Sequence, residues 1–273
     1  MELNIYWSVF KNIEKEFENL LYNIHLDDSQ LNVYSSKITD LLLRTCSEVE
    51  SISKELFIKE GGILPENKYL NFENAIKYLN KKLKIEKKSI IINSYNCFIS
   101  NRIIKPFQKN SKRTGTNKMT YNWNNAYQNL KHSRFNSITF GNIENLLHGL
   151  SALFILNIYY KNENFHIGKD SNLTNFDTSL GSSVFSVSYH KESEYTIDDN
   201  YLKGENFDES VYLVIPDQFL YKKLKESLSK IKNTKTSESH LSNNAKEIIK
   251  DINELRNRTM EMKYRLELNK NQL

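Results

Sequence analysis

Apolar side chains recur every three or four positions along most of the first 161 residues, the spacing that gathers them on one face of an α-helix. The most apolar run, residues 146–160, contains His148 and Asn157 and is shorter than the roughly 20 residues that a membrane span needs. We therefore interpret it as part of a buried core helix. Together with the capping residues and breaks in the pattern, this spacing predicts helices over residues 4–24, 31–58, 71–83, 123–135 and 142–161, the third capped by Asn71.

The pattern changes after residue 161. Residues 183–190 and 210–216 carry the β-branched and aromatic side chains that are typical of strands, and they predict a small two-stranded hairpin or sheet edge. Residues 89–94 fit either a strand or an extended segment, and their periodicity does not separate the two. A further helix is predicted over residues 217–231.

The chain closes with a predicted helix that ends near residue 269 and carries a thin apolar stripe among many charges. Such a stripe is typical of a helix that packs on a partner or on the body of the chain. We expect a mainly α fold, a helical bundle with a small β-hairpin insertion and a long C-terminal helix. The predicted organisation is a helical core over 1–161, a strand-containing extension with a helix over 162–232, and a C-terminal helix over 240–273.

The composition supports long helices and a folded core. The chain of 273 residues has only 8 Gly and 3 Pro, and 39% of its residues are hydrophobic, which argues against an all-β fold and against disorder. Cys46 and Cys97 have no ligand spacing and are expected to be reduced core residues, so no metal site and no cofactor are predicted. No secretion or membrane segment is recognisable, which predicts a cytoplasmic protein without membrane contact.

Charge is distributed unevenly, although the net charge is only +5. Residues 87–143 contain ten Lys and Arg and no Asp or Glu, so this window is either a solvated face or a surface that binds a polyanion through released phosphate counterions. Within it, residues 108–119 form a polar, basic loop that is either a surface connection or a segment that closes over a phosphate backbone. The candidate nucleic-acid-binding residues are Lys105, Lys109, Lys112, Arg113 and Lys118.

The segment "WNNAYQNLKHSRF" (123–135) carries the candidate chemistry. Helical spacing places Trp123, Tyr127, Lys131 and Arg134 on one face, with His132 beside it. Aromatic rings, cations and an imidazole suit base stacking, phosphate binding and proton transfer, whereas the alternative is two core anchors and two cations that reach water. Arg44 and Glu48, four residues apart on the second helix, are either a surface ion pair or a support for this cluster.

Four segments together resemble a family of uncharacterised bacterial helical proteins with HEPN-like character: "LLLRTCSEVESISKEL" (41–56), "IIKPF" (103–107), "WNNAYQNLKHSR" (123–134) and "NIENLLHGLSALFIL" (142–156). The resemblance implies an HEPN-like bundle and a role in bacterial defence or toxin systems. Active HEPN proteins are metal-independent endoribonucleases whose motif is an Arg, four to six residues and a His, paired across a dimer. His132 matches that histidine, but Asn125, Ala126 and Tyr127 occupy the positions where the Arg is expected.

Two hypotheses follow. In the first, a homodimer binds or cleaves RNA without a cofactor, His132 transferring protons and Lys131 and Arg134 stabilising the phosphorane. In the second, the chain is a non-catalytic interaction or sensor protein that binds nucleic acid through its basic face and a protein partner through its C-terminal helix.

Overall fold

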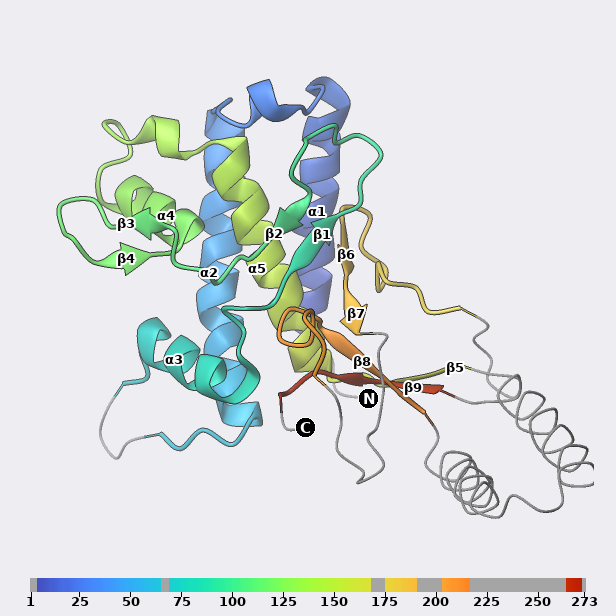
Figure 1. The fold of residues 1–273 in the computed structure, drawn as a ribbon. Coiled ribbons are helices and arrows are strands. Elements are labelled where there is room, and N and C mark those ends of the chain that lie inside the picture. Colours follow the sequence, from blue (N-terminus) through green and yellow to red (C-terminus); the bar gives the residue numbers. More distant parts are fainter. Residues whose placement is uncertain (1–3, 65–68, 168–174, 191–202, 217–263, 272–273) are drawn as a thin grey trace, which may run out of the picture.

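The computed structural model describes residues 4–64, 69–167, 175–190, 203–216 and 264–271. Within them the main helices are α1 (Ile5–Asn23), α2 (Ser36–Lys59), α3 (Phe72–Leu83), α4 (Asn122–His132) and α5 (Ile143–Lys161) (Figure 1). These are the helices predicted from the apolar spacing, although α2 begins later, at Ser36, because Ser35 is extended and caps the helix by accepting a hydrogen bond from the Ile38 amide. The predicted cap of α3 is confirmed, since the Asn71 side chain accepts a hydrogen bond from the Asn74 amide at 2.8 Å.

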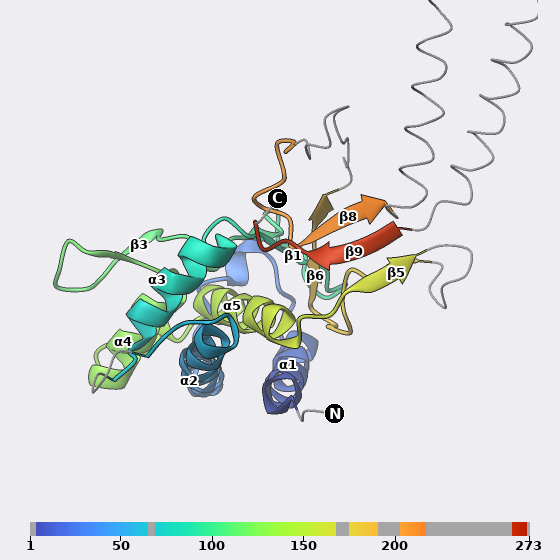
Figure 2. The same cartoon turned by 90° about the horizontal axis from the view of Figure 1, so that it is seen from below.

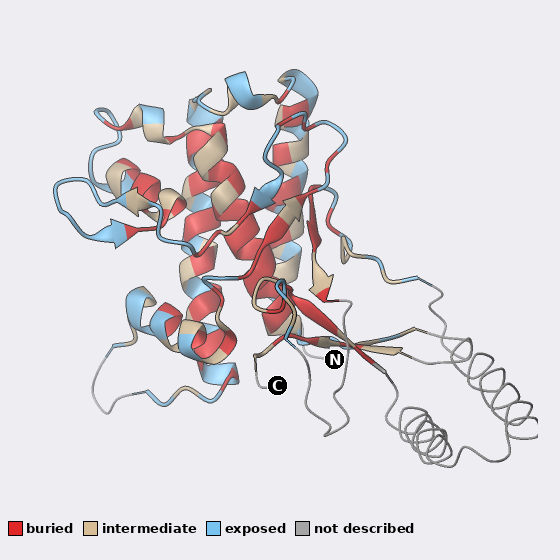
Figure 3. Cartoon of the chain, viewed as in Figure 1, coloured by how far each residue is buried: buried red, intermediate tan, exposed pale blue. Residues whose placement is uncertain are grey.

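Helix α5 is the centre of the fold. It packs against α2, with α1 and α4 on its flanks, so it is buried on nearly every side (Figures 2 and 3). The approach to α2 is close at Gly149, where a Cβ atom would lie 3.3 Å from Leu42 Cδ1. The predicted buried core helix is thus confirmed, and no helix in the described ranges is both long and apolar enough to cross a membrane.

The described residues form three sheets as well as helices, so the predicted mainly α fold is wrong and the protein is mixed α/β. One sheet joins β2 (Ile103–Ile104), β1 (Ile90–Ile92) and β6 (Phe185–Val187) in that order, with antiparallel pairing. Residues 89–94, for which two interpretations were open, therefore contain a strand. The strands of this sheet are two or three residues long and pair across longer connections than a tight turn, so the scarcity of turn-forming Gly and Pro did not exclude them.

The second sheet has the order β5 (Phe165–Ile167), β9 (Tyr264–Leu268), β8 (Tyr212–Pro216) and β7 (Tyr189–His190). The predicted hairpin between residues 183–190 and 210–216 is wrong, because β7 and β8 pair in parallel while β6 joins the first sheet. The predicted C-terminal helix is also wrong at its end, since β9 lies between β5 and β8. The helix predicted over 217–231 and residues 240–263 lie outside the described residues.

Both cysteines are buried free thiols, as predicted for core residues. Burial raises the pKa of the Cys46 thiol well above its ordinary value, and it raises that of Cys97 as well. In the parts of the chain that the structure describes, no three His, Cys, Asp or Glu side chains are grouped so that they could hold a metal ion.

Candidate anion-binding pocket

The three candidate catalytic residues lie at and just beyond the C-terminal end of α4, where all are exposed. Lys131 places its Nζ 5.4 Å from the centre of the Tyr127 ring. Arg134 forms an ion pair with Asp40 of α2, and His132 has no ion-pair partner among the described residues. None of the three lines either of the two pockets described below.

The predicted supporting residues have different surroundings. Trp123 is fully buried and donates a hydrogen bond from Nε1 to the Pro106 carbonyl at 2.9 Å, and Tyr127 is also buried. Arg44 forms its ion pair with Glu16 of α1 rather than with Glu48, and burial raises the pKa of the Glu48 carboxyl. The aromatic rings of α4 therefore pack into the core, and Arg44 links α2 to α1 instead of supporting α4.

The basic segment 108–119 folds into a two-stranded hairpin, with β3 (Ser111–Lys112) antiparallel to β4 (Met119–Thr120). The Arg113 amide donates to the Lys118 carbonyl at 2.9 Å, and Gly115 at the tip has a φ of +76°, which glycine adopts without strain. The hairpin places Arg113 and Lys118 on opposite sides of one tight turn.

Two asparagines one turn apart on α4 hold the hairpin in place. Asn125 Oδ1 accepts a hydrogen bond from the Thr114 amide at 3.1 Å, and its Nδ2 donates to Ser111 Oγ at 3.3 Å. Asn129 Nδ2 donates to Thr114 Oγ1 at 2.8 Å. Sequence reasoning missed both residues, although two amides four positions apart in one helix, where Asn is a poor helix former, were a signal of such a contact.

Replacing Asn125 with Ala should loosen the hairpin while the helix itself is retained. Loss of the buried amide leaves the Thr114 N–H and the Ser111 hydroxyl without this hydrogen-bond partner, which lowers the free energy of unfolding by about 1–3 kcal/mol. Trypsin should then cut faster after Arg113 and Lys118. Gln128→Ala on the same helix is the matched control, and equal cleavage rates in the two variants would contradict this role of Asn125.

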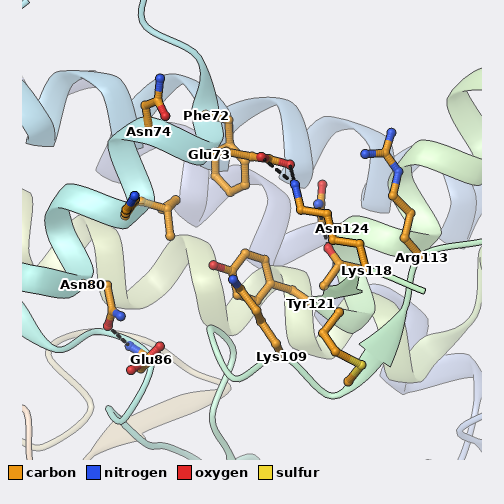
Figure 4. Close-up of a pocket in the computed structure, with 14 residues that line it drawn as sticks. Phe72, Glu73, Asn74, Asn80, Glu86, Lys109, Arg113, Lys118, Tyr121 and Asn124 are labelled. Carbon is orange, nitrogen blue, oxygen red and sulfur yellow. Dashed lines mark hydrogen bonds and ion pairs between the residues drawn. The ribbon is translucent and has the colours of Figure 1, made fainter. Parts of the chain in front are cut away.

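The hairpin and α3 enclose a pocket with a cavity volume of about 380 Å³ (Figure 4). Asn74, Asn80 and Asn124 add amide groups to its lining, and Figure 4 shows the cations of the hairpin side opposite Glu73 of α3. Four cations and two carboxylates line it, so the lining is net positive: Lys77, Lys109, Arg113 and Lys118 against Glu73 and Glu86. Three of the five residues predicted to bind nucleic acid thus meet in one pocket.

Glu73 is the electrostatic centre of this pocket. Lys118 Nζ donates to both of its carboxylate oxygens, at 3.0 and 2.9 Å. That hydrogen bond lowers the pKa of Glu73, and the charges of Lys118, Arg113 and Lys109 lower it further. Three cations are therefore close enough to one exposed carboxylate to stabilise its negative charge, which is the environment that a bound phosphate requires.

Tyr121 forms the buried wall of the pocket. Its ring stacks on Trp123 with 5.6 Å between ring centres, and burial raises its pKa to about 12, with smaller contributions from Glu86 and Glu73. The phenol is therefore neutral at physiological pH and can donate a hydrogen bond to an anion.

Several other cations of residues 87–143 are neutralised by acidic residues from outside that window, or are buried. Lys105 forms an ion pair with Glu209 at 2.6 Å, Lys87 pairs with Asp208 at 2.7 Å, and Lys88 is buried. Lys112 is exposed on β3 and has no ion pair with a described residue. The basic surface is consequently concentrated at the hairpin and its pocket, and Lys105 lies outside that pocket.

Comparisons of the chain with protein-family models, with curated proteins and with solved structures find no match.

Proposed function

We propose that this protein binds nucleic acid, with backbone phosphates held in the hairpin pocket. The observation that carries the proposal is the convergence of Lys109, Arg113 and Lys118 on one exposed carboxylate. Because the lining holds more cations than carboxylates, an incoming phosphate can replace Glu73 as the partner of Lys118. The Arg113 guanidinium can then bind two phosphate oxygens at once, which a lysine cannot do.

A polymer fits this surface better than a single small anion. The cations come from two separated elements, Lys77 from α3 and the others from the hairpin and the segment before it, and Lys112 extends the positive charge along β3. Each phosphate that is neutralised releases condensed counterions, so a row of cations binds a charged backbone more tightly than one phosphate. Lys131, His132 and Arg134 do not line this pocket and take no part in this proposal.

Lys118→Ala and Arg113→Ala should each weaken binding to a labelled single-stranded RNA by about five- to tenfold at low salt and reduce its salt dependence by about one phosphate contact. Glu73→Gln should strengthen binding, because it removes the carboxylate that competes with phosphate for Lys118. Fluorescence anisotropy in EDTA at several salt concentrations measures both the affinity and the salt slope.

Lys37→Ala is the matched control, since Lys37 is an exposed lysine of α2 that pairs with Glu16 of α1 and does not line the pocket. It removes the same unit of charge from the molecule without touching the pocket. If Lys118→Ala and Lys37→Ala change affinity equally, or if Glu73→Gln weakens binding, the pocket is not the phosphate site.

A further inference from the structure

A second pocket, with a cavity volume of about 460 Å³, lies between the first half of α5 and the β1–β2 strands. This size is within the range of about 300–1,000 Å³ that is usual for small-molecule sites. Its walls include the aliphatic side chains of Ile92, Ile104 and Leu147, and its rim carries the amides of Asn101, Asn110 and Asn122. The combination of apolar walls and an amide rim suits a flat ligand with a polar edge.

His148 of α5 lines this pocket one helical turn after Glu144. His148 is half-buried, and its imidazole forms no hydrogen bond with any residue that the structure describes. Burial lowers its pKa to about 4, so the ring is neutral at physiological pH and offers one donor and one acceptor. A polar ring in such a pocket, with no partner among the described residues, is a group available to a ligand.

The charges of the second pocket disfavour a phosphate. Asp28 and Glu144 both line it, and the cation that accompanies them, Lys105, already forms an ion pair with Glu209. Asp28 in turn accepts hydrogen bonds from the Ser100 amide and hydroxyl. A neutral ligand that donates hydrogen bonds, for example through amino groups, fits this lining better than an anion does.

The two pockets share a wall. Gln108 and Asn110 line the second pocket, whereas Lys109 between them lines the hairpin pocket. The start of α4 alternates in the same way, since Asn122 lines the second pocket and Tyr121 lines the hairpin pocket. A strand whose phosphates contact the hairpin therefore lies beside the rim of the second pocket.

We propose that the second pocket takes an unstacked nucleobase of the same single strand whose phosphates occupy the hairpin pocket, an inference that rests on the proposed function. The aliphatic walls cover the faces of the base. His148 and the rim amides bind its polar edge, and Glu144 accepts from an amino group. Recognition of splayed bases through their edges is how proteins usually read single-stranded RNA.

The two pockets can be tested separately with small probes. Binding of adenosine, cytidine, guanosine and uridine, which carry no phosphate, is measured by calorimetry or by saturation-transfer NMR, and binding of pyrophosphate is measured alongside. At least one nucleoside should bind, and His148→Leu should weaken it about tenfold while pyrophosphate binding is unchanged. His148→Gln, which keeps a donor and an acceptor, should retain most of the affinity.

Asn110→Ala guards against a folding defect, because Asn110 is exposed and its loss should weaken nucleoside binding without lowering the melting temperature. With single-stranded RNA, His148→Leu should lower affinity and leave the salt slope unchanged, whereas Lys118→Ala should reduce the slope.

Absence of binding by all four nucleosides, or nucleoside binding that is the same in His148→Leu and Asn110→Ala as in the wild type, would overturn the inference. If pyrophosphate binds and responds to Lys118→Ala in that case, the phosphate site stands without the base pocket. If nucleosides bind as expected and pyrophosphate does not, the hairpin pocket fails and the base pocket remains.

Discussion

Removing residues 264–273 should leave the protein without a cooperative unfolding transition. Strand β9 pairs with β5 on one side and β8 on the other, and Leu266 and Leu268 are buried in the core. Asn269 adds a fully buried amide that donates to the carbonyls of Phe207 and Ser210, and its own carbonyl accepts from the Tyr159 hydroxyl at 2.9 Å. The deletion removes two strand ladders and the burial of two leucines at once. Together these losses are comparable with the 5–15 kcal/mol that usually stabilises a whole domain, so we expect a broad or absent melt.

Single substitutions on β9 test the strand's contribution to the free energy of unfolding without shortening the chain. Leu266→Ser should lower the free energy of unfolding by about 2–5 kcal/mol, whereas Arg265→Ser, at a more exposed neighbouring position, should change it by less than about 1 kcal/mol. Circular dichroism and calorimetry measure both. A sharp transition in the shortened chain at the wild-type temperature would show that β9 does not hold the sheet together.

The free energy of unfolding should rise between pH 7 and pH 9.5 because of Lys88. This lysine is fully buried and donates to the Ser210 carbonyl at 3.1 Å and to Asn271 Oδ1 at 2.8 Å. Burial lowers its pKa from 10.5 to about 7, against a smaller opposing effect of Asp208. Between these two values the unfolded chain binds more protons than the folded one, so stability increases with pH, by about 3 kcal/mol at most over this window.

Lys88→Met should abolish that rise and make the protein at least as stable as the wild type at pH 7, because no charge is then buried at this position. The Ser210 carbonyl keeps the Asn269 amide as a donor at 3.0 Å. Lys81→Met, at an exposed site on α3, should keep the wild-type slope. Urea titrations at intervals of half a pH unit test this, and a slope that persists in Lys88→Met would assign the effect to other groups.

The helices could be predicted from the sequence because each one carries its apolar pattern locally. Helix α5 is the clearest example, since its residues are apolar on all sides and it is buried on nearly all sides. The sheets could not be predicted in the same way, because the pairing of β9 with β5 and β8 depends on residues far apart in the chain. The apolar positions among the charges near the C-terminal end therefore predicted a helix, although residues 264–268 form a strand.

The sequence predicted the cations of the candidate site but not the carboxylates with which they pair. Lys109, Arg113 and Lys118 stand in a window without acids, yet the carboxylate they share is Glu73, which is 45 positions before Lys118. Helical spacing likewise grouped Lys131, His132 and Arg134, but Arg134 pairs with Asp40 of α2 while Lys131 lies over the Tyr127 ring. Side-chain direction at the end of a helix depends on the neighbouring elements, which spacing along one helix does not contain. The resemblance to HEPN-like proteins and its predicted RNA cleavage stay predictions.

The position of β9 also orders the events of synthesis. Strands β5 and β8 leave the ribosome before β9, yet β9 is the strand that lies between them. Until residue 268 has been made, β5 lacks the strand it pairs with, and β8 has only the short parallel pairing with β7. All of the residues of the α1, α2 and α5 bundle are made by residue 161, so the bundle can form before β9 is synthesised. The nascent chain therefore exposes unpaired strand edges until β9 has been made, and during that interval a chaperone would protect it from aggregation.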